Sequence, residues 1–414
     1  MKATRFLWLV VLGGYLATNF SSAQTWIQTS APTNSWRSVA SSADGTRLVA
    51  VADSTAGIPA GPGAIYLSTN SGVTWNQSGA PGNYWGSVAS SADGTKLVAL
   101  AGGPYTSTNS GATWTSDGLT NGLVWWSAVS SADGTVLAAL AAPFSVYPTS
   151  GAVFISTNSG MSWVSNSITE ASLEAIACSA DGTKMVVASS WGIYTSTNSG
   201  SDWSSWNVTN NVPAGWSAVA SSADGTKLVA IKNSLIFIST DSGMTWTQTS
   251  APATNWTAVA SSADGSKLVA VAGGSNDDGP LVVYHDCPIY TSTDFGVTWI
   301  SNSLPVGGWS PLGTSVASSA DGGRLSAVVN PRPFGGGIWM LQTTPVPSIS
   351  ARPTNGSLAL SWLVASTNFV LQQSTDLSSW SDLTNTPVLN LANLHDEVAL
   401  PFVGTSSFYR LKTP

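Results

Sequence analysis

The chain has 414 residues, of which only 8% are charged, and its formal net charge at pH 7 is −7. Lys and Glu are scarce, whereas Gly, Ser, Thr, Ala and Trp are abundant, so the composition favours strands and turns over long solvated helices. Because no basic stripe is present, we expect no nucleic-acid partner. The length suits one large repeat domain followed by a small module.

Residues 1–23 are predicted to be a signal peptide. A positive end at residues 2–5 precedes an apolar run at residues 6–17, and Ser21-Ser22-Ala23 offers small residues to a signal peptidase. The mature chain would start at Gln24 and lie on the bacterial exterior or in the periplasm. The alternative is an uncleaved anchor, for which the apolar run is short; we expect no membrane span in the mature chain.

Two turn motifs alternate from residue 25 to about residue 344, at a spacing of about 40–57 residues, which indicates a repeat protein. The first is an eight-residue box, Ser-Thr-Asn-Ser-Gly-Val-Thr-Trp at 68–75, with further copies at 107–114, 156–163, 196–203, 239–246 and 292–299. The second is a Ser-Ala-Asp-Gly hairpin, centred on Asp44, Asp93, Asp133, Asp181, Asp224, Asp264 and Asp321.

Each unit is predicted to hold four short strands. In one example, 236–238, 245–248, 256–261 and 267–271 are rich in Val, Ile, Trp and Thr and are bounded by Gly, Asp or Ser. The runs are apolar on both faces, as expected for sheets buried between neighbours. In the turns, the Asp or Asn side chain accepts backbone hydrogen bonds and the Gly takes the positive φ that closes the hairpin.

The box Ser-x-Asp-x-Gly-x-Thr-Trp resembles the Asp box, or BNR repeat, of sialidase-like β-propellers. Residues 239–246 and 292–299 match it with Asp, and the other four copies carry Asn. The resemblance implies four-stranded blades around a central channel, with each box between the third and fourth strands. It does not imply sialidase activity, because such boxes occur in several hydrolases and also in non-enzymes such as photosystem assembly factors.

The motif counts predict how the ring closes. The sequence contains seven hairpins but only six boxes, and no fourth strand follows the last unit. The segment 25–32 nearly duplicates 245–252, and Trp26 precedes Asp44 by the spacing that separates Trp246 from Asp264. We therefore predict an all-β fold: a seven-bladed propeller over residues 24–344 whose outermost last strand comes from the mature N-terminus.

Residues 345–414 are predicted to form a small β-sandwich after a Pro345-Val346-Pro347 linker. Strands are expected at 357–362, 369–373, 379–383, 397–402 and 408–411. The segments Phe369-Val370-Leu371-Gln372, Leu377-Ser378-Ser379-Trp380 and Phe408-Tyr409-Arg410-Leu411 resemble modules that end many secreted proteins of Verrucomicrobia-type bacteria. Attachment or spacing is the role that this implies.

Cys178 and Cys287 are the two cysteines of the chain. Secretion would permit a disulfide. Cys178, however, replaces a repeat Ser in a predicted inner strand, and Cys287 lies in a long loop two units later. We expect two separate thiols.

Binding is expected on the face opposite the boxes and hairpins, where the loops vary in length: 53–63, 101–104, 141–152, 188–192, 232–234, 272–287 and 330–336. A Trp starts most inner strands, eight residues before the hairpin Asp. A ring of such indoles at the channel mouth could stack on sugars or peptides; the alternative is packing between blades. The candidates are Trp36, Trp85, Trp125, Trp216, Trp256 and a displaced Trp309, with Leu173 at this place in unit four.

The loop 272–287 is a second candidate site, and Arg37 is a separate ligand-binding candidate. It carries Tyr284, His285 and Asp286, but one His with dispersed acids lacks metal-ligand spacing, and the loop could simply be solvated. We expect no metal and no cofactor.

Sialidase chemistry is disfavoured by an inventory of arginines. The resemblance implies three arginines for a substrate carboxylate, yet Arg47 and Arg324 sit beside hairpin turns, which leaves only Arg37 and Arg332. A glycosidase needs two carboxylates across a cleft, for which Glu170 or Glu174 with Asp53 or Asp278 are the available residues, and nothing singles them out.

The favoured interpretation is a secreted, monomeric, non-catalytic binding or scaffold protein with a polysaccharide or an extracellular protein as ligand. The alternative is a glycoside hydrolase of the Asp-box propeller type whose acid and base are not recognised.

Overall fold

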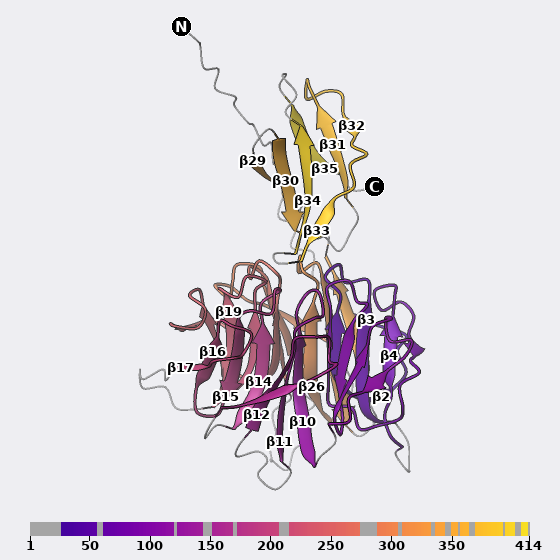
Figure 1. The fold of residues 1–414 in the computed structure, drawn as a ribbon, viewed down its shortest axis with the longest axis vertical. Helices are drawn as coiled ribbons and strands as arrows, with labels where there is room; N and C mark the ends of the chain where they lie inside the picture. The colour runs from indigo at the N-terminus through magenta and orange to yellow at the C-terminus, as the bar shows by residue number, and fades with distance from the viewer. Residues whose placement is uncertain are drawn as a thin grey trace.

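A computed structural model of the chain describes residues 26–412 apart from 56–60, 120–121, 144–150, 169–171, 207–214, 274–287, 305–308, 333–335, 344–348, 355–356, 364–368, 392–393 and 402–406. The predicted signal peptide lies outside the described residues. Within the described part every regular element is a β-strand. No helix there is long and apolar enough to cross a bilayer. The strands form a large ring of sheets with a smaller two-sheet module above it (Figure 1).

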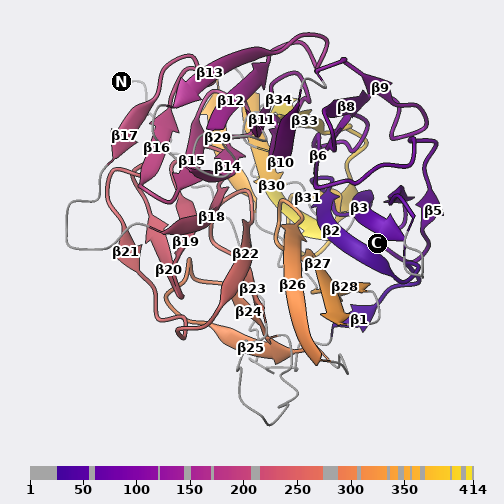
Figure 2. The ribbon, with the colours of Figure 1, turned by 90° about the horizontal axis from the view of Figure 1, so that it is seen from below.

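The ring consists of seven four-stranded antiparallel sheets around a central axis, which confirms the seven-bladed propeller (Figure 2). Blade 1 contains β2 (Asn34–Ser41), β3 (Leu48–Thr55), β4 (Ile65–Ser68) and β5 (Asn76–Gln77). Blade 2 contains β6 (Ser87–Ser90), β7 (Leu97–Leu100), β8 (Pro104–Ser107) and β9 (Thr115–Ser116). Blade 3 contains β10 (Leu123–Ser130), β11 (Leu137–Pro143), β12 (Gly151–Ser156) and β13 (Val164–Ile168).

The remaining blades follow the same order. Blade 4 contains β14 (Leu173–Cys178), β15 (Met185–Ser189), β16 (Ile193–Ser196) and β17 (Ser204–Trp206). Blade 5 contains β18 (Trp216–Ser221), β19 (Leu228–Lys232), β20 (Leu235–Ser239) and β21 (Thr247–Gln248). Blade 6 contains β22 (Trp256–Ser261), β23 (Leu268–Ala272), β24 (Pro288–Ser292) and β25 (Ile300–Ser303). Blade 7 contains β26 (Trp309–Ser318), β27 (Arg324–Arg332), β28 (Gly337–Gln342) and β1 (Ile27–Gln28).

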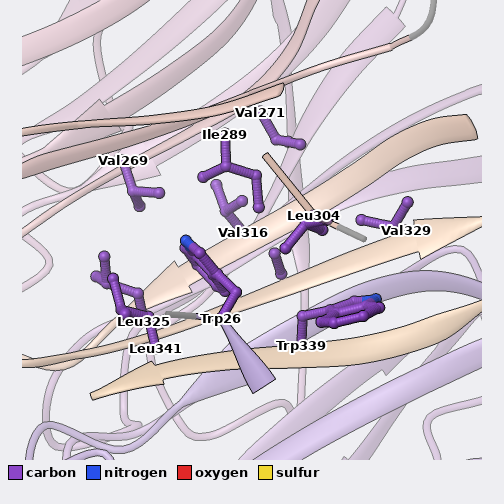
Figure 3. Packing of buried hydrophobic residues seen from close by; sticks show 11 residues of the cluster. Trp26, Val269, Val271, Ile289, Leu304, Val316, Leu325, Val329, Trp339 and Leu341 are labelled. Carbon is purple, nitrogen blue, oxygen red and sulfur yellow. The ribbon is translucent and has the colours of Figure 1, made fainter. Parts of the chain in front are cut away.

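The N-terminal strand closes the ring as the motif count predicts. β1 pairs antiparallel with β28, so that Ile27 lies opposite Met340. Trp26, just before β1, is 4% exposed and packs in a core shared by blades 6 and 7 with Leu304 and Val269 (Figure 3). Closure through a buried Trp leaves no long open edge between the first and last blades.

A closed circle of backbone hydrogen bonds surrounds the axis. In every hairpin the N–H of the Ala in Ser-Ala-Asp-Gly donates to the carbonyl of the same Ala in the next blade, at 2.7–2.8 Å. The circle runs through Ala43, Ala92, Ala132, Ala180, Ala223, Ala263 and Ala320 and returns to Ala43. Seven backbones converge closely here, and a small side chain at this place leaves room for that approach.

The Asp boxes are structural turns, and their geometry explains why Asn replaces Asp. In blade 5, Asp241 Oδ1 accepts the Thr245 N–H at 2.9 Å, and the Thr245 hydroxyl donates to Oδ2 at 2.6 Å. In blade 1, Asn70 Oδ1 accepts the Thr74 N–H at 2.9 Å, while Nδ2 donates to the Thr74 hydroxyl at 2.8 Å. Since the threonine hydroxyl can donate or accept, both residues satisfy the same turn.

Each box lies at the same end of its blade as the hairpin. The Ser71 N–H of the first box donates to the carbonyl of Thr46, next to the hairpin, at 2.8 Å. We name this end the hairpin face. In an antiparallel four-stranded blade, the connections from second to third strand and from one blade to the next lie at the opposite end, which we name the loop face.

The C-terminal module is a small sandwich of two sheets. One contains β29 (Ser350–Thr354), β30 (Ser357–Leu363), β34 (His395–Pro401) and β33 (Val388–Asn390), and the other contains β32 (Ser381–Asp382), β31 (Val370–Ser374) and β35 (Phe408–Lys412). A shared core holds both sheets, with Leu360 and Trp362 from one and Leu371 and Leu411 from the other. The sequence predicts five of these strands; β29 and β33 are additional.

Candidate functional site

The Trp residues that stand eight residues before the hairpin Asp are buried, not exposed at a channel mouth. Trp36, Trp85, Trp125, Trp216 and Trp256 are 0–4% exposed. Each indole packs against an aromatic ring of the third strand of its own blade, with centroids 4.7–5.5 Å apart. An indole without an exposed face cannot stack on a ligand, so this geometry supports the packing alternative for these five residues.

The other predicted site residues are placed as follows. Trp309 starts β26, with its backbone opposite Arg332. Tyr284, His285 and Asp286 lie outside the described residues. Arg37 is about half exposed, and its guanidinium donates from Nε to Asp53 Oδ2 at 2.6 Å. Because the pair is open to solvent, it orients Arg37 more than it stabilises the fold.

In five blades a β-bulge follows the Trp or Leu that stands eight residues before the hairpin Asp. The pairing register between first and second strands skips one residue after Trp36, Trp125, Leu173, Trp216 and Trp256. A bulge redirects a side chain and is typical of regions next to functional sites. The skipped residues, which we name the bulge residues, are Arg37, Trp126, Glu174, Ser217 and Thr257.

The bulge residues differ from their neighbours in exposure and in chemistry. Arg37, Glu174 and Ser217 are exposed, and Trp126 and Thr257 are partly exposed. They supply a guanidinium, a carboxylate, an indole and two hydroxyls at the loop-face ends of the strands that surround the channel. The repeated position is therefore used for packing. At the varied position, Trp126 packs partly on the core of blades 3 and 4 and the Thr257 hydroxyl donates to the Val271 carbonyl at 3.1 Å, whereas the Arg37, Glu174 and Ser217 side chains are exposed.

Two indoles and a carboxylate lie near the loop-face end of blades 3 and 4, and we name Trp126, Glu174 and Trp191 the blade 3–4 cluster. A Cβ on Gly151 would lie 3.3 Å from the Trp126 ring and 3.4 Å from Leu173, so Trp126 reaches the residue that precedes Glu174. The Ser190 N–H donates to the Ser172 carbonyl at 3.0 Å. This bond holds the β15–β16 loop, whose Trp191 is 66% exposed, against the same segment.

Glu174 lies in an environment that disfavours its charge. Burial raises the pKa of Glu174, and the hydrogen bond from the Ser172 hydroxyl, at 3.0 Å, opposes that effect. The carboxylate is still exposed enough to meet a ligand. Its oxygens can accept hydrogen bonds from hydroxyl or amide donors of a ligand.

Two other unusual ionisable groups at this end of the propeller belong to the fold. Burial raises the pKa of Asp117, although its Oδ1 accepts the Leu119 N–H at 3.0 Å. In a later blade the Thr249 hydroxyl occupies the same place and accepts the Ala251 N–H. Asp117 therefore holds a turn. Lys232 is buried with its ammonium 4.8 Å from the Trp216 ring centroid, and burial lowers its pKa.

On the hairpin face, the arginines excluded from a sialidase triad hold neighbouring blades together. Arg47 Nη1 donates to the Ser110 hydroxyl at 2.6 Å, and Arg324 Nη1 donates to the Asp44 carbonyl at 3.0 Å. In the part of the chain that the structure describes, no three His, Cys, Asp or Glu side chains gather into a possible metal site.

Sequence reasoning selected Trp125 and missed Trp126 and Trp191. The signal was present in the repeats: the strand-start residue is Trp in five units, whereas the next residue is Arg37, Gly86, Trp126, Glu174, Ser217 or Thr257. A position whose residue changes between otherwise similar repeats has no structural role common to all blades. Such a position can therefore have a specific role in one blade.

Comparison with known proteins identifies the fold and not the family. No protein-family model and no curated protein sequence matches the chain. YCF48 from Cyanidioschyzon merolae superposes with a TM-score of 0.54 at 16% identity, over 78% of this chain and 99% of that chain. A structure of YCF48 bound to D1 peptide gives 0.51 at 16% identity, over 78% and 98%. The Cps50 (Swd1) β-propeller domain from Myceliophteria thermophila gives 0.54 at 11% identity, over 76% and 98%.

Proposed function

We propose that this protein is a secreted, non-catalytic binding or scaffold propeller that holds its ligand on the loop face, at the blade 3–4 cluster. One observation carries the proposal: in five blades a bulge leaves a chemically varied residue unpaired near the loop-face end of the inner strand. The repeated residues beside them are occupied by packing. Varied side chains on a rigid scaffold are typical of binding surfaces.

A polysaccharide is the ligand that the cluster favours. A sugar ring has an apolar C–H face that suits an exposed indole, and hydroxyls that need acceptors such as the Glu174 carboxylate. Trp191 and Trp126 supply the indoles on two neighbouring blades. The likeness to a propeller bound to a peptide supports an extended protein segment as the other ligand class, and the experiment below separates the two.

The engagement of the loop-face carboxylates supports binding without catalysis. Among the described residues of this face, Asp53 is paired with Arg37 and Asp117 holds a turn, which leaves Glu174. Glycoside hydrolysis uses two carboxyl groups on either side of the scissile bond. The exposed Glu174 carboxylate, which already accepts the Ser172 hydroxyl, can also accept a ligand hydroxyl, but a single carboxylate cannot supply both catalytic roles.

The test is retention of the mature chain on a panel of insoluble polysaccharides, with reducing ends measured in the same tubes. We expect retention on at least one polysaccharide, without release of reducing ends. Trp126→Ala with Trp191→Ala should lower retention more than about tenfold, since each stacking contact is worth on the order of 1 kcal/mol. Glu174→Gln should weaken retention less, because the amide still accepts a hydrogen bond.

The matched control is Met161→Ala, which removes an exposed apolar side chain from the hairpin face. It should leave retention unchanged. Release of reducing ends that disappears in Glu174→Gln would establish the hydrolase alternative instead. Retention that is equal in the double Trp variant and in the control would place the ligand elsewhere. If the same variants lose binding to a displayed peptide library and no polysaccharide is retained, the ligand is a protein segment.

A further inference from the structure

A cavity of about 180 Å³ lies on the axis at the hairpin-face end of the channel. All seven blades contribute to its wall through the residues of their hairpins, including the seven alanines of the backbone circle. Among the described residues, the C-terminal module contributes one lining residue, Leu394. The module stands above this end of the propeller (Figure 1).

The polar groups of the wall are occupied within the propeller. In six blades the last Ser of the inner strand donates its hydroxyl proton to the carbonyl of the next residue, at 2.8–3.0 Å. In blade 4 the Cys178 thiol donates to the Ser130 carbonyl at 3.4 Å. With these donors engaged, the wall can accept an apolar side chain at its centre without leaving a hydroxyl proton unpaired.

Leu394 is presented by a turn with unusual backbone geometry. Its φ is 55°, in the left-handed region that a Leu rarely adopts. It lies immediately before β34, whose first residue, His395, pairs with Asn390 of β33. A non-Gly residue keeps such a strained conformation where the surrounding structure fixes it. Here the strained residue is the one that lines the axial cavity.

We propose that the C-terminal module is a cap on the propeller, held by Leu394 seated in the hairpin-face mouth of the channel. The seat is a ring of small side chains from seven blades, and its occupant is Leu394, the residue immediately before β34 of the same chain. The channel is then closed at this end and open to ligands at the loop face. The proposal does not depend on the ligand proposed above.

A disulfide scan tests this seating in the full chain. Leu394→Cys is combined with one ring thiol at a time, a Cys replacing Ser41, Ser90, Ser130, Ser221, Ser261 or Ser318. In each variant the native Cys178 and Cys287 are both replaced by Ser. Oxidation should join the module to at least one ring position, detected as a cross-linked peptide by mass spectrometry.

The matched control is Leu391→Cys with the same ring thiols, because Leu391 is exposed just three residues earlier and does not line the cavity. Seating raises the effective concentration of the thiols, so the best Leu394→Cys pair should cross-link more than about tenfold above the control. No cross-link at any of the six ring positions, or equal yields from Leu394→Cys and Leu391→Cys, would overturn the proposal.

A second measurement does not require a cysteine. Leu394→Asp places a charge in the seat and should release the module, which would increase the radius of gyration in small-angle scattering while the propeller stays folded. Leu391→Asp should leave the radius of gyration at the wild-type value. If Leu394→Asp also leaves it unchanged, Leu394 does not hold the module on the propeller.

Discussion

The side-chain amide of Asn330 binds both the backbone N–H and the backbone carbonyl of Trp36. The side-chain oxygen of Asn330 accepts the Trp36 N–H at 3.1 Å, and its nitrogen donates to the Trp36 carbonyl at 2.5 Å. The two residues lie 294 positions apart, in β27 of blade 7 and β2 of blade 1. The Asn330 amide therefore joins blade 7 to blade 1, in addition to the Ala320–Ala43 bond of the backbone circle and to the β1–β28 pairing.

Replacing Asn330 by Ala should lower the free energy of unfolding by about 1–3 kcal/mol, because two backbone groups at the seam would lose their partners. Asn330→Asp should cost at least as much at neutral pH, since a carboxylate can accept from the N–H but repels the carbonyl. Urea unfolding gives both values. Asn76→Ala, at an exposed position of β5, is the control and should stay near wild type. Equal stability of Asn330→Ala and the control would contradict this role.

The hairpin aspartates should make the propeller unstable in acid. Burial opposes ionisation of Asp264, but hydrogen bonds from the Ser262 hydroxyl, at 2.6 Å, and from Ser266 outweigh it and lower the pKa of Asp264. The same direction holds in four other hairpins: Asp93, Asp133, Asp181 and Asp224. A carboxyl whose folded pKa is depressed contributes stability above its unfolded pKa, about 3.9, and loses it as pH falls through the folded pKa.

Thermal unfolding between pH 7 and pH 2 measures this effect. The melting temperature of the wild type should decrease once the pH falls below about 4. The melting temperature of Asp264→Asn should decrease less steeply, because unfolding of this variant takes up one proton fewer. Asp117→Asn is a control, because the contribution of Asp117 to stability depends on pH in the opposite direction. Burial raises the pKa of Asp117, so its contribution is present at low pH and is lost as pH rises through the folded pKa. A steeper acid loss in Asp264→Asn than in wild type would contradict the assignment.

The sequence predicts most of the propeller because the propeller depends on repeated turn chemistry. Six boxes against seven hairpins predict the closing strand near Trp26, which the β1–β28 pairing confirms. In the C-terminal module no repeat exists, and β29 is hidden by Pro353, which an edge strand tolerates. The candidate site depends on bulges, which a pairing register shows and a single strand sequence does not. The sequence alone does not show that Trp125 is the buried residue and Trp126 the partly exposed bulge residue, because both are Trp.

The adjacent residues Trp125 and Trp126 should separate stability from binding. Trp125→Ala removes an indole that is 4% exposed and should cost about 3–5 kcal/mol of unfolding free energy. Trp126→Ala removes a partly exposed indole at the bulge and should cost less, while it lowers retention of the ligand. Chemical denaturation and polysaccharide retention on the same two proteins check both expectations. The reverse pattern, with Trp126→Ala the more unstable protein, would show that the bulge residue is part of the core.

Cys178 should be nearly inert in the folded protein. Burial, aided by the nearby negative charge of Asp181, raises the pKa of Cys178 to about 12. Since the thiolate is the reactive form and an ordinary thiol has a pKa of about 8.5, alkylation at pH 8 should be slower than in urea by about three orders of magnitude. Iodoacetamide labelling of Cys287→Ser, followed by mass spectrometry, measures the two rates, and equal rates would show an open thiol. Cys178→Ser should fold normally, because the other six blades carry Ser at this place and its hydroxyl can donate to the next carbonyl as theirs do.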